Sequence, residues 1–101
     1  MIKTYNPYIG GSFKPTTNTF PVKSPFNNEI LANVHLASKI ELEEAIVAAQ
    51  KVENELRLIP SYKKYKILID IAQGMKEHRE NLAQTLCLEA AKPIKYAFGE
   101  V

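Results

Sequence analysis

Cys87 is the one side chain in this sequence that could serve as a strong nucleophile. A cysteine attacks carbonyl groups or binds metals as the thiolate, which forms where a histidine, a basic cluster or a helix N-terminus stands close by. Cys87 lies between Leu86 and Leu88 in a helical pattern, without a histidine or a run of basic residues beside it. We therefore expect a buried, inert thiol.

The two histidines are the next candidates, because imidazole is a common metal ligand and proton carrier. His35 and His78 fall on different expected elements and lack the close spacing that brings two imidazoles to one zinc ion. We expect surface or capping histidines and no metal site.

Two short motifs mimic catalytic signatures. Ser61-Tyr62-Lys63-Lys64 fits the Ser-x-x-Lys tetrad of the penicillin-recognising enzymes, but their Ser-Asp-Asn and Lys-Thr-Gly elements are absent. Serine before a helix is usually a cap. Gly10-Gly11 is not followed by a Gly-x-Gly-x-x-Gly or Gly-Lys-Ser/Thr sequence or by a helix, so it indicates a hairpin turn and not a phosphate loop.

Lys63, Lys64 and Lys66 crowd the start of an expected helix, where the helix dipole disfavours cations. Two interpretations stay open: a solvated helix face, or a contact with acidic groups on a partner.

The chain has 101 residues, of which 46% are hydrophobic and 24% charged, as expected for one small globular domain. A chain of this size has little room for the large cavity of a complete cofactor enzyme. The net charge of +2 is not concentrated in a basic patch, which argues against nucleic-acid binding.

The sequence also lacks an apolar run long enough to cross a membrane, and its first residues do not resemble a secretory signal. A single cysteine agrees with a reducing compartment. We expect a cytoplasmic protein without a membrane contact.

Residues 1–37 form an expected strand and turn segment. Ile9–Phe13 indicates a strand entering the Gly10-Gly11 turn, with Phe20–Lys23 as its partner strand, and Pro21 places that partner at a sheet edge. Residues 29–36 alternate apolar and polar side chains and predict a third strand.

Residues 38–101 predict three to four amphipathic helices. Ser38 and Glu41 form a capping box, in which the serine hydroxyl should accept from the amide three residues on. An ion pair is expected between Glu53 and Arg57. Pro60 ends this helix, whose apolar stripe is Leu42, Ala45, Ile46, Ala49, Val52 and Leu56.

Three further helices follow. Ser61 is expected to cap the second, which runs to about His78 with the stripe Tyr65, Leu68, Ile71, Ala72 and Met75. Gly74 interrupts it, and we favour a closely crossing neighbour over a weakened helix end as the reason. The third begins near Arg79, and the fourth covers Pro93–Val101.

Several segments, taken in order, resemble the N-terminal region of the NAD(P)-dependent aldehyde dehydrogenase superfamily. They are Tyr8–Phe13, Phe20–Val22 with Ser24-Pro25 and Asn27, Glu29–Val34, the alanines Ala45, Ala48 and Ala49, the break at Pro60, Ile67-Leu68 with Ile71-Ala72, Glu80–Ala83, Glu89–Ile94 and Glu100-Val101. The Lys-Pro-Ile-Lys segment looks closest to the lactaldehyde and non-phosphorylating glyceraldehyde-phosphate branch. Lys64 departs from the arginine of many members, and Ala91 from the glycine of most.

This resemblance implies an α+β fragment, mostly α, in which residues 1–37 and 38–101 together form an incomplete portion of the cofactor-binding domain of a longer α/β enzyme. That enzyme would oxidise an aldehyde through a cysteine thioester with NAD or NADP. Its catalytic groups lie downstream, so neither Cys87 nor Glu89 takes a catalytic role. We assign no catalytic, cofactor-binding or metal residue and expect the isolated chain to be inactive and not to bind NAD.

The expected partner is the remainder of the parent enzyme. Alone, the helices either close into a small bundle or leave apolar faces through which several chains self-associate. The alternative is a free-standing helical interaction module, non-enzymatic, that shares only its periodicity with the family.

Overall fold

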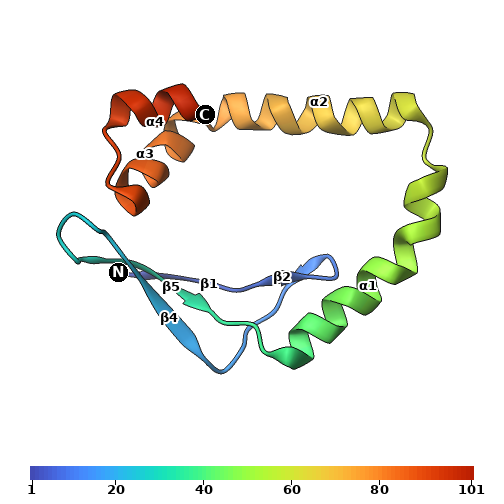
Figure 1. Cartoon of the computed structure of the whole chain (residues 1–101), viewed down its shortest axis with the longest axis horizontal. Coiled ribbons are helices and arrows are strands. Elements are labelled where there is room, and N and C mark those ends of the chain that lie inside the picture. The colour runs from blue at the N-terminus through green and yellow to red at the C-terminus, as the bar shows by residue number, and fades with distance from the viewer. The chain divides into compact units, whose positions relative to one another are not determined.

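The computed structural model describes all residues, 1–101, as short strands followed by four helices (Figure 1). The elements are β1 (Lys3–Tyr5), β2 (Tyr8–Ile9), β3 (Ser12–Phe13), β4 (Thr19–Lys23), β5 (Ile30–His35), α1 (Lys39–Leu58), α2 (Ser61–Glu77), α3 (Arg79–Ala90) and α4 (Ile94–Glu100). The α+β, mostly helical class is thereby confirmed. Two compact units divide the chain: residues 1–23 with 30–58, and residues 24–29 with 59–101.

A three-stranded sheet in the order β1-β5-β4 organises the first unit (Figure 1). β5 lies in the middle, parallel to β1 and antiparallel to β4. The predicted third strand is confirmed, and Ala32 on it is buried. Pro21 lies on edge strand β4, as predicted, where its missing N–H breaks no ladder bond. The sequence did not predict β1.

The predicted pairing of Ile9–Phe13 with Phe20–Lys23 is wrong. Tyr8 pairs with Phe13 and Ile9 with Ser12, so β2 and β3 form a hairpin of their own. Gly10 and Gly11 have φ of 58° and 88°, the positive values that a two-residue hairpin turn requires and that glycine adopts without strain. Such a turn joins its immediate neighbours, which leaves β4 free to pair with β5.

Helix α1 begins at the predicted capping box. The Ser38 amide donates to the Glu41 carboxylate at 2.6 Å, and the Ser38 hydroxyl donates to the same oxygen. The Ser38 hydroxyl oxygen accepts from the amide of Ile40 at 3.2 Å, two residues on and not three as expected. The side-chain bond from Ser38, and then its backbone bond, hold the pKa of Glu41 below its ordinary value.

The other end of α1 differs from its prediction. Glu53 forms no ion pair, because the Arg57 guanidinium donates to the Asn54 side chain one turn away at 2.5 Å. The helix contacts the β2–β3 hairpin through small residues: a Cβ on Gly10 would lie 3.6 Å from the Ala48 Cβ. α1 buries none of its residues.

Helix α2 begins without the predicted serine cap. Ser61 is its first residue and Pro60 is the N-cap, whose carbonyl accepts from the amides of Lys63 at 3.0 Å and Lys64 at 3.2 Å. The close crossing expected at Gly74 is also wrong, because nothing lies within 4 Å of where its Cβ would stand. Like α1, α2 buries none of its residues.

Helices α3 and α4 pack together around two alanines, Ala83 and Ala97, which are both fully buried. Arg79 donates to the Phe98 carbonyl at 2.8 Å, and its guanidinium stands 5.7 Å from the centre of the Phe98 ring. Lys92, in the connection, pairs with Glu100. These contacts tie α4 back onto α3.

Ala91 ends α3 in the left-handed conformation, with φ 50° and ψ 32°. An L-residue with a Cβ is strained there, and glycine is the residue usually found at this position of a helix end. Ala91, which stands where a glycine was expected from the resemblance, therefore has a strained left-handed backbone.

None of the four helices combines the length and the hydrophobicity that a membrane span requires.

Candidate functional site

The candidate chemical groups are not assembled into one site. Cys87 is half-buried on α3, less buried than predicted. It borders a cavity of about 300 Å³ lined by Ser24, Phe26 and Asn27 on one side and by Leu88 and Ala91–Pro93 on the other. This lining contains neither a histidine nor a carboxylate that could take the thiol proton. The arrangement therefore offers Cys87 no general base.

His35 has a structural role. Its Nδ1 lies 2.6 Å from the Thr16 carbonyl and 3.2 Å from the Thr16 amide, so the imidazole attaches the loop before β4 to the end of β5. His78 stands at the junction of α2 and α3, where its amide donates to the Gly74 carbonyl and its carbonyl accepts from Leu82. No group of three His, Cys, Asp or Glu residues is close enough together to hold a metal ion.

The two motif-like segments have local functions. Ser61 lies within the first turn of α2, and no hydrogen bond joins its hydroxyl to Lys64. Gly10 and Gly11 form the β2–β3 turn, as predicted, and the chain continues into a strand and not into a helix whose N-terminus could hold a phosphate. Gly10-Gly11 is therefore a hairpin turn and not a phosphate loop.

A groove of about 900 Å³ lies between α1 and the β2–β3 hairpin. Its apolar lining includes Ile9, Ile40 and Val47, and Lys14, also in the lining, forms an ion pair with Glu44 at 2.6 Å. Its charged groups are exposed except for the half-buried Lys14, and its lining contains neither a cysteine or serine nor a histidine. These apolar side chains suit packing against another apolar surface better than catalysis.

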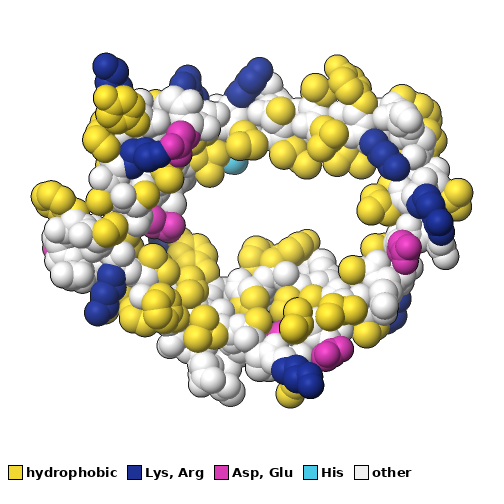
Figure 2. All heavy atoms as spheres, in the orientation of Figure 1, with side chains coloured by type: hydrophobic (Ala, Val, Ile, Leu, Met, Phe, Trp, Pro, Cys, Tyr) yellow, Lys and Arg dark blue, Asp and Glu magenta, His cyan; other side chains and the backbone are white.

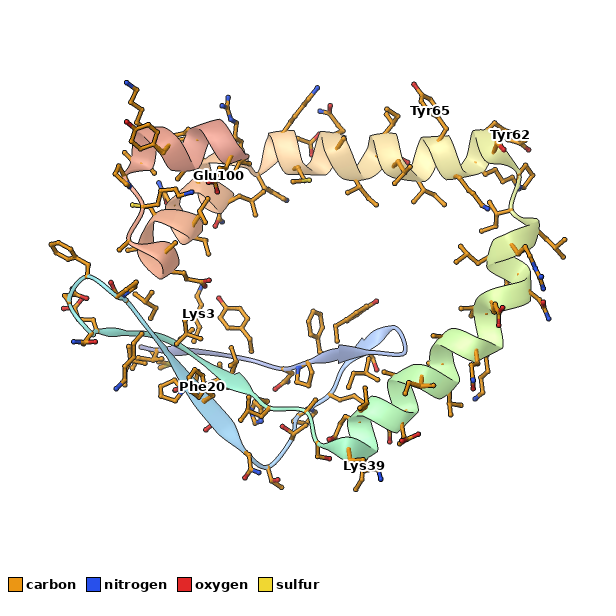
Figure 3. The ribbon with its side chains drawn as sticks, viewed as in Figure 1. Lys3, Phe20, Lys39, Tyr62, Tyr65 and Glu100 are labelled. Carbon is orange, nitrogen blue, oxygen red and sulfur yellow. The ribbon has the colours of Figure 1, made fainter.

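Exposed apolar faces on α1 and α2 are the most prominent feature of the molecule. Leu68 on α2 is 65% exposed and Leu42 on α1 is 57% exposed, and none of the large side chains of the chain is fully buried. Figure 2 shows hydrophobic side chains along the surface of α2, and Figure 3 shows Tyr62 and Tyr65 projecting from its first turns. Sequence periodicity predicted these stripes and left open whether the helices cover them in a small bundle or leave them exposed.

The three lysines at the start of α2, Lys63, Lys64 and Lys66, differ in their contacts. Lys66 pairs with Asp70 at 2.7 Å on one exposed side of the helix. Lys63 and Lys64 form no ion pair. The ion pair on an exposed side agrees with a solvated face for Lys66, and for Lys63 and Lys64 both interpretations stay open.

Comparison with known proteins identifies what these elements resemble. The family model described as "Aldehyde dehydrogenase family" matches residues 13–101. A lactaldehyde dehydrogenase of Methanocaldococcus jannaschii is 39% identical over 80 residues, which cover 79% of this chain and 17% of that protein. Malonate-semialdehyde dehydrogenase 2 of Geobacillus thermodenitrificans is 36% identical over 101 residues, covering 98% of this chain and 21% of that protein.

Solved structures agree with these relatives. Aldehyde dehydrogenase 21 from Physcomitrella patens, in complex with the reaction product succinate, superposes with a TM-score of 0.94 at 28% identity over 99% of this chain and 21% of that one. Betaine aldehyde dehydrogenase from Staphylococcus aureus, in complex with NAD+, superposes with a TM-score of 0.91 at 28% identity. The match covers 95% of this chain and 20% of that chain. The chain spans about a fifth of the length of the relatives it matches.

Proposed function

The chain belongs to the aldehyde dehydrogenase family, and on that premise we propose that it is the N-terminal structural portion of an NAD(P)-dependent enzyme that oxidises an aldehyde to a carboxylic acid. The nicotinamide would accept the hydride in such an enzyme, and no residue of this chain is assigned to bind it. The chain's own contribution is scaffolding, and by itself it is inactive.

The observation that carries this proposal is the absence of any buried residue on α1 and α2. Amphipathic helices form because a covered apolar face stabilises them, and short isolated helices are marginal in water. Both helices nevertheless match solved aldehyde dehydrogenases within a segment that covers nearly the whole chain. The remaining four-fifths of such an enzyme is therefore the partner that we propose for these faces.

The match includes the strands as well as the helices, so shared helical periodicity does not account for it. This favours the scaffold over a free-standing interaction module. The single Cys87 agrees with a reducing compartment, and a cytoplasmic location is part of the proposal. The substrate class follows the relatives named above: a small aldehyde, such as lactaldehyde or malonate semialdehyde.

A chimera tests the scaffold role. This chain replaces the matching fifth of the Geobacillus thermodenitrificans enzyme, and NAD-dependent oxidation of malonate semialdehyde is followed by nicotinamide absorbance. We expect a soluble, active chimera, and no turnover by the 101-residue chain alone. An isolated chain that oxidises the aldehyde contradicts the proposal.

Two substitutions to lysine on α2 test whether its apolar face is covered in the enzyme while its polar face is solvated. Leu68→Lys in the chimera puts a charge into the covered face and should abolish soluble, active enzyme, since burying an unpaired ammonium is very unfavourable. Gln73→Lys is the matched control: it lies on the same helix, where the Gln73 amide bonds only to Glu77 at 3.1 Å, and it should preserve activity. Equal tolerance of both substitutions counts against the scaffold.

A further inference from the structure

The side-chain bonds of helix α2 show which of its sides is polar. Lys66 pairs with Asp70 at 2.7 Å. On the same side of the helix, Gln73 donates to Glu77 at 3.1 Å. These four side chains form a polar strip along α2. The helix turns by about 100° per residue, so large apolar side chains form an apolar face on the opposite side: Leu68, Ile71 and Met75.

Lys64 lies on this apolar face. Around the helix axis it is about 20° from Ile71 and about 20° from Met75, whereas the polar strip is about 120–180° away. The residues one turn further on, Ile67 and Leu68, are both apolar. The helix therefore surrounds this ammonium group with apolar neighbours.

No acidic group of the same unit compensates Lys64. The first turn of α2 contains no acidic residue. The position four residues on, where a carboxylate would form an i,i+4 pair, is Leu68. The unit formed by residues 24–29 and 59–101 contains two ion pairs, and Lys64 belongs to neither. Its charge is therefore unpaired within that unit.

The other lysines of α2 have local explanations. Lys63 lies about 20° from Asp70, beside the polar strip, and Lys66 belongs to the strip. Lys76 lies in the last turn, where the helix dipole favours a cation. Lys64 lies in the first turn, where the dipole disfavours a cation, so its place on the apolar face needs a different reason.

Covering the apolar face removes the Lys64 ammonium group from water. Burying an unpaired ammonium is very unfavourable, and for that reason Leu68→Lys is expected to abolish the enzyme. The unmodified chain already carries a lysine one turn before Leu68 on the same face. The surface that covers the face therefore has to compensate this charge, and a carboxylate both pairs with an ammonium and accepts its hydrogen bonds.

We propose that the segment covering the apolar face of α2 presents an Asp or Glu carboxylate to Lys64, among apolar side chains that pack on Leu68 and Ile71. The partner is one segment of the remaining four-fifths of the enzyme, apolar with an acidic residue, and the inference rests on the proposed function. The ion pair also fixes the register of that segment on α2, because a shift by one helical turn leaves both charges buried and unpaired.

The chimera with the Geobacillus thermodenitrificans enzyme tests the carboxylate. Lys64→Met removes the charge and keeps an unbranched side chain. It leaves the carboxylate buried without its cation and should lower the Tm of the chimera by about 5 °C or more. Lys64→Arg keeps a cation and should retain most of the stability. Lys63→Met, the matched change beside the polar strip, should leave the Tm unchanged.

The isolated 101-residue chain provides a second comparison. It lacks the covering segment, so Lys64→Met should not lower its Tm. A similar fall of Tm in the isolated chain and in the chimera would overturn the proposal, because the stabilising contact of Lys64 would then lie within the chain.

Charge reversal locates the carboxylate. Lys64→Glu should abolish the soluble, active chimera, and changing one Asp or Glu of the Geobacillus part to lysine should restore it. Glu53→Lys is the control within this chain, because Glu53 also forms no ion pair. Restoration by Glu53→Lys would place the partner of Lys64 within the chain and contradict the proposal.

The failure of this inference differs from the failure of the proposed function. An unmodified chimera without activity refutes the proposed function, and the inference with it. An active chimera in which Lys64→Met is as stable as the unmodified protein refutes the carboxylate alone, since a lysine that extends to solvent gains nothing from a partner. If Lys64→Met is insoluble while Lys64→Arg and Lys63→Met are soluble, the loss is specific to the missing cation and supports the proposal.

Discussion

Replacing Ala91 with glycine should stabilise the chain. Ala91 ends α3 at φ 50° and ψ 32°, where a Cβ costs about 1–2 kcal/mol. Glycine removes that cost but gives the unfolded chain more conformational freedom, which lowers the stability gain by about 0.4–1 kcal/mol. The net expectation for Ala91→Gly is a gain of roughly 0.5–1 kcal/mol in the free energy of unfolding.

Thermal unfolding followed by circular dichroism measures this gain. For a domain of this size, 1 kcal/mol shifts Tm by about 4–8 °C, so Ala91→Gly should raise Tm by roughly 2–8 °C. Ala90→Gly is the matched control, because Ala90 is the neighbouring residue and still belongs to α3. It should lower the stability by about 0.5 kcal/mol. A Tm that falls equally in both variants refutes the left-handed assignment at Ala91.

Three further expectations follow from local contacts. The Glu41 carboxylate is stabilised by Ser38, so its contribution to folding is fully present above the unfolded-state pKa and is lost as the pH falls through the lower folded-state pKa; Glu41→Gln should flatten the acid side of a Tm-against-pH profile. Gly10→Ala should destabilise by about 1 kcal/mol because of its positive φ, whereas Gly99→Ala, in α4 with open space around it, should stabilise by about 0.5–1 kcal/mol in chemical denaturation. Cys87 is half-buried and should react with a water-soluble disulfide reagent in the folded chain; a thiol that reacts only after unfolding contradicts this exposure.

Signals that act over a few residues could be predicted from the sequence. The Ser38–Glu41 capping box depends on groups three residues apart, and the Gly10-Gly11 turn depends on two adjacent glycines. Both are present in the structure. Helix boundaries near Pro60 and Pro93 follow from the missing proline N–H.

Interactions between distant segments could not be predicted in this way. β1 has three residues and pairs with a strand that follows it after more than twenty residues, so no local pattern announces it. The pairing predicted for Phe20–Lys23 is wrong for the same reason. Alternation of apolar and polar side chains marks a strand but does not say which strand lies beside it.

The candidate site shows the same limit. Sequence periodicity located the apolar stripes of α1 and α2, but it could not say whether a stripe is covered. The structure leaves Leu42 and Leu68 exposed, and only contacts with other chain segments or other molecules could cover them. Cys87 was expected to be buried from its apolar neighbours Leu86 and Leu88, although its exposure depends on how the turn near Phe26 packs against α3.

The strand order of the sheet has a consequence for the sequence of folding events. β4 and β5 are joined by a short turn, so their pairing closes a small loop and costs little chain entropy. β1 can dock only after β5 exists, and it closes a much longer loop for three residue pairs. We therefore expect the β4–β5 ribbon to form first, and the N-terminal strand to be the last to join the sheet and the first to detach from it.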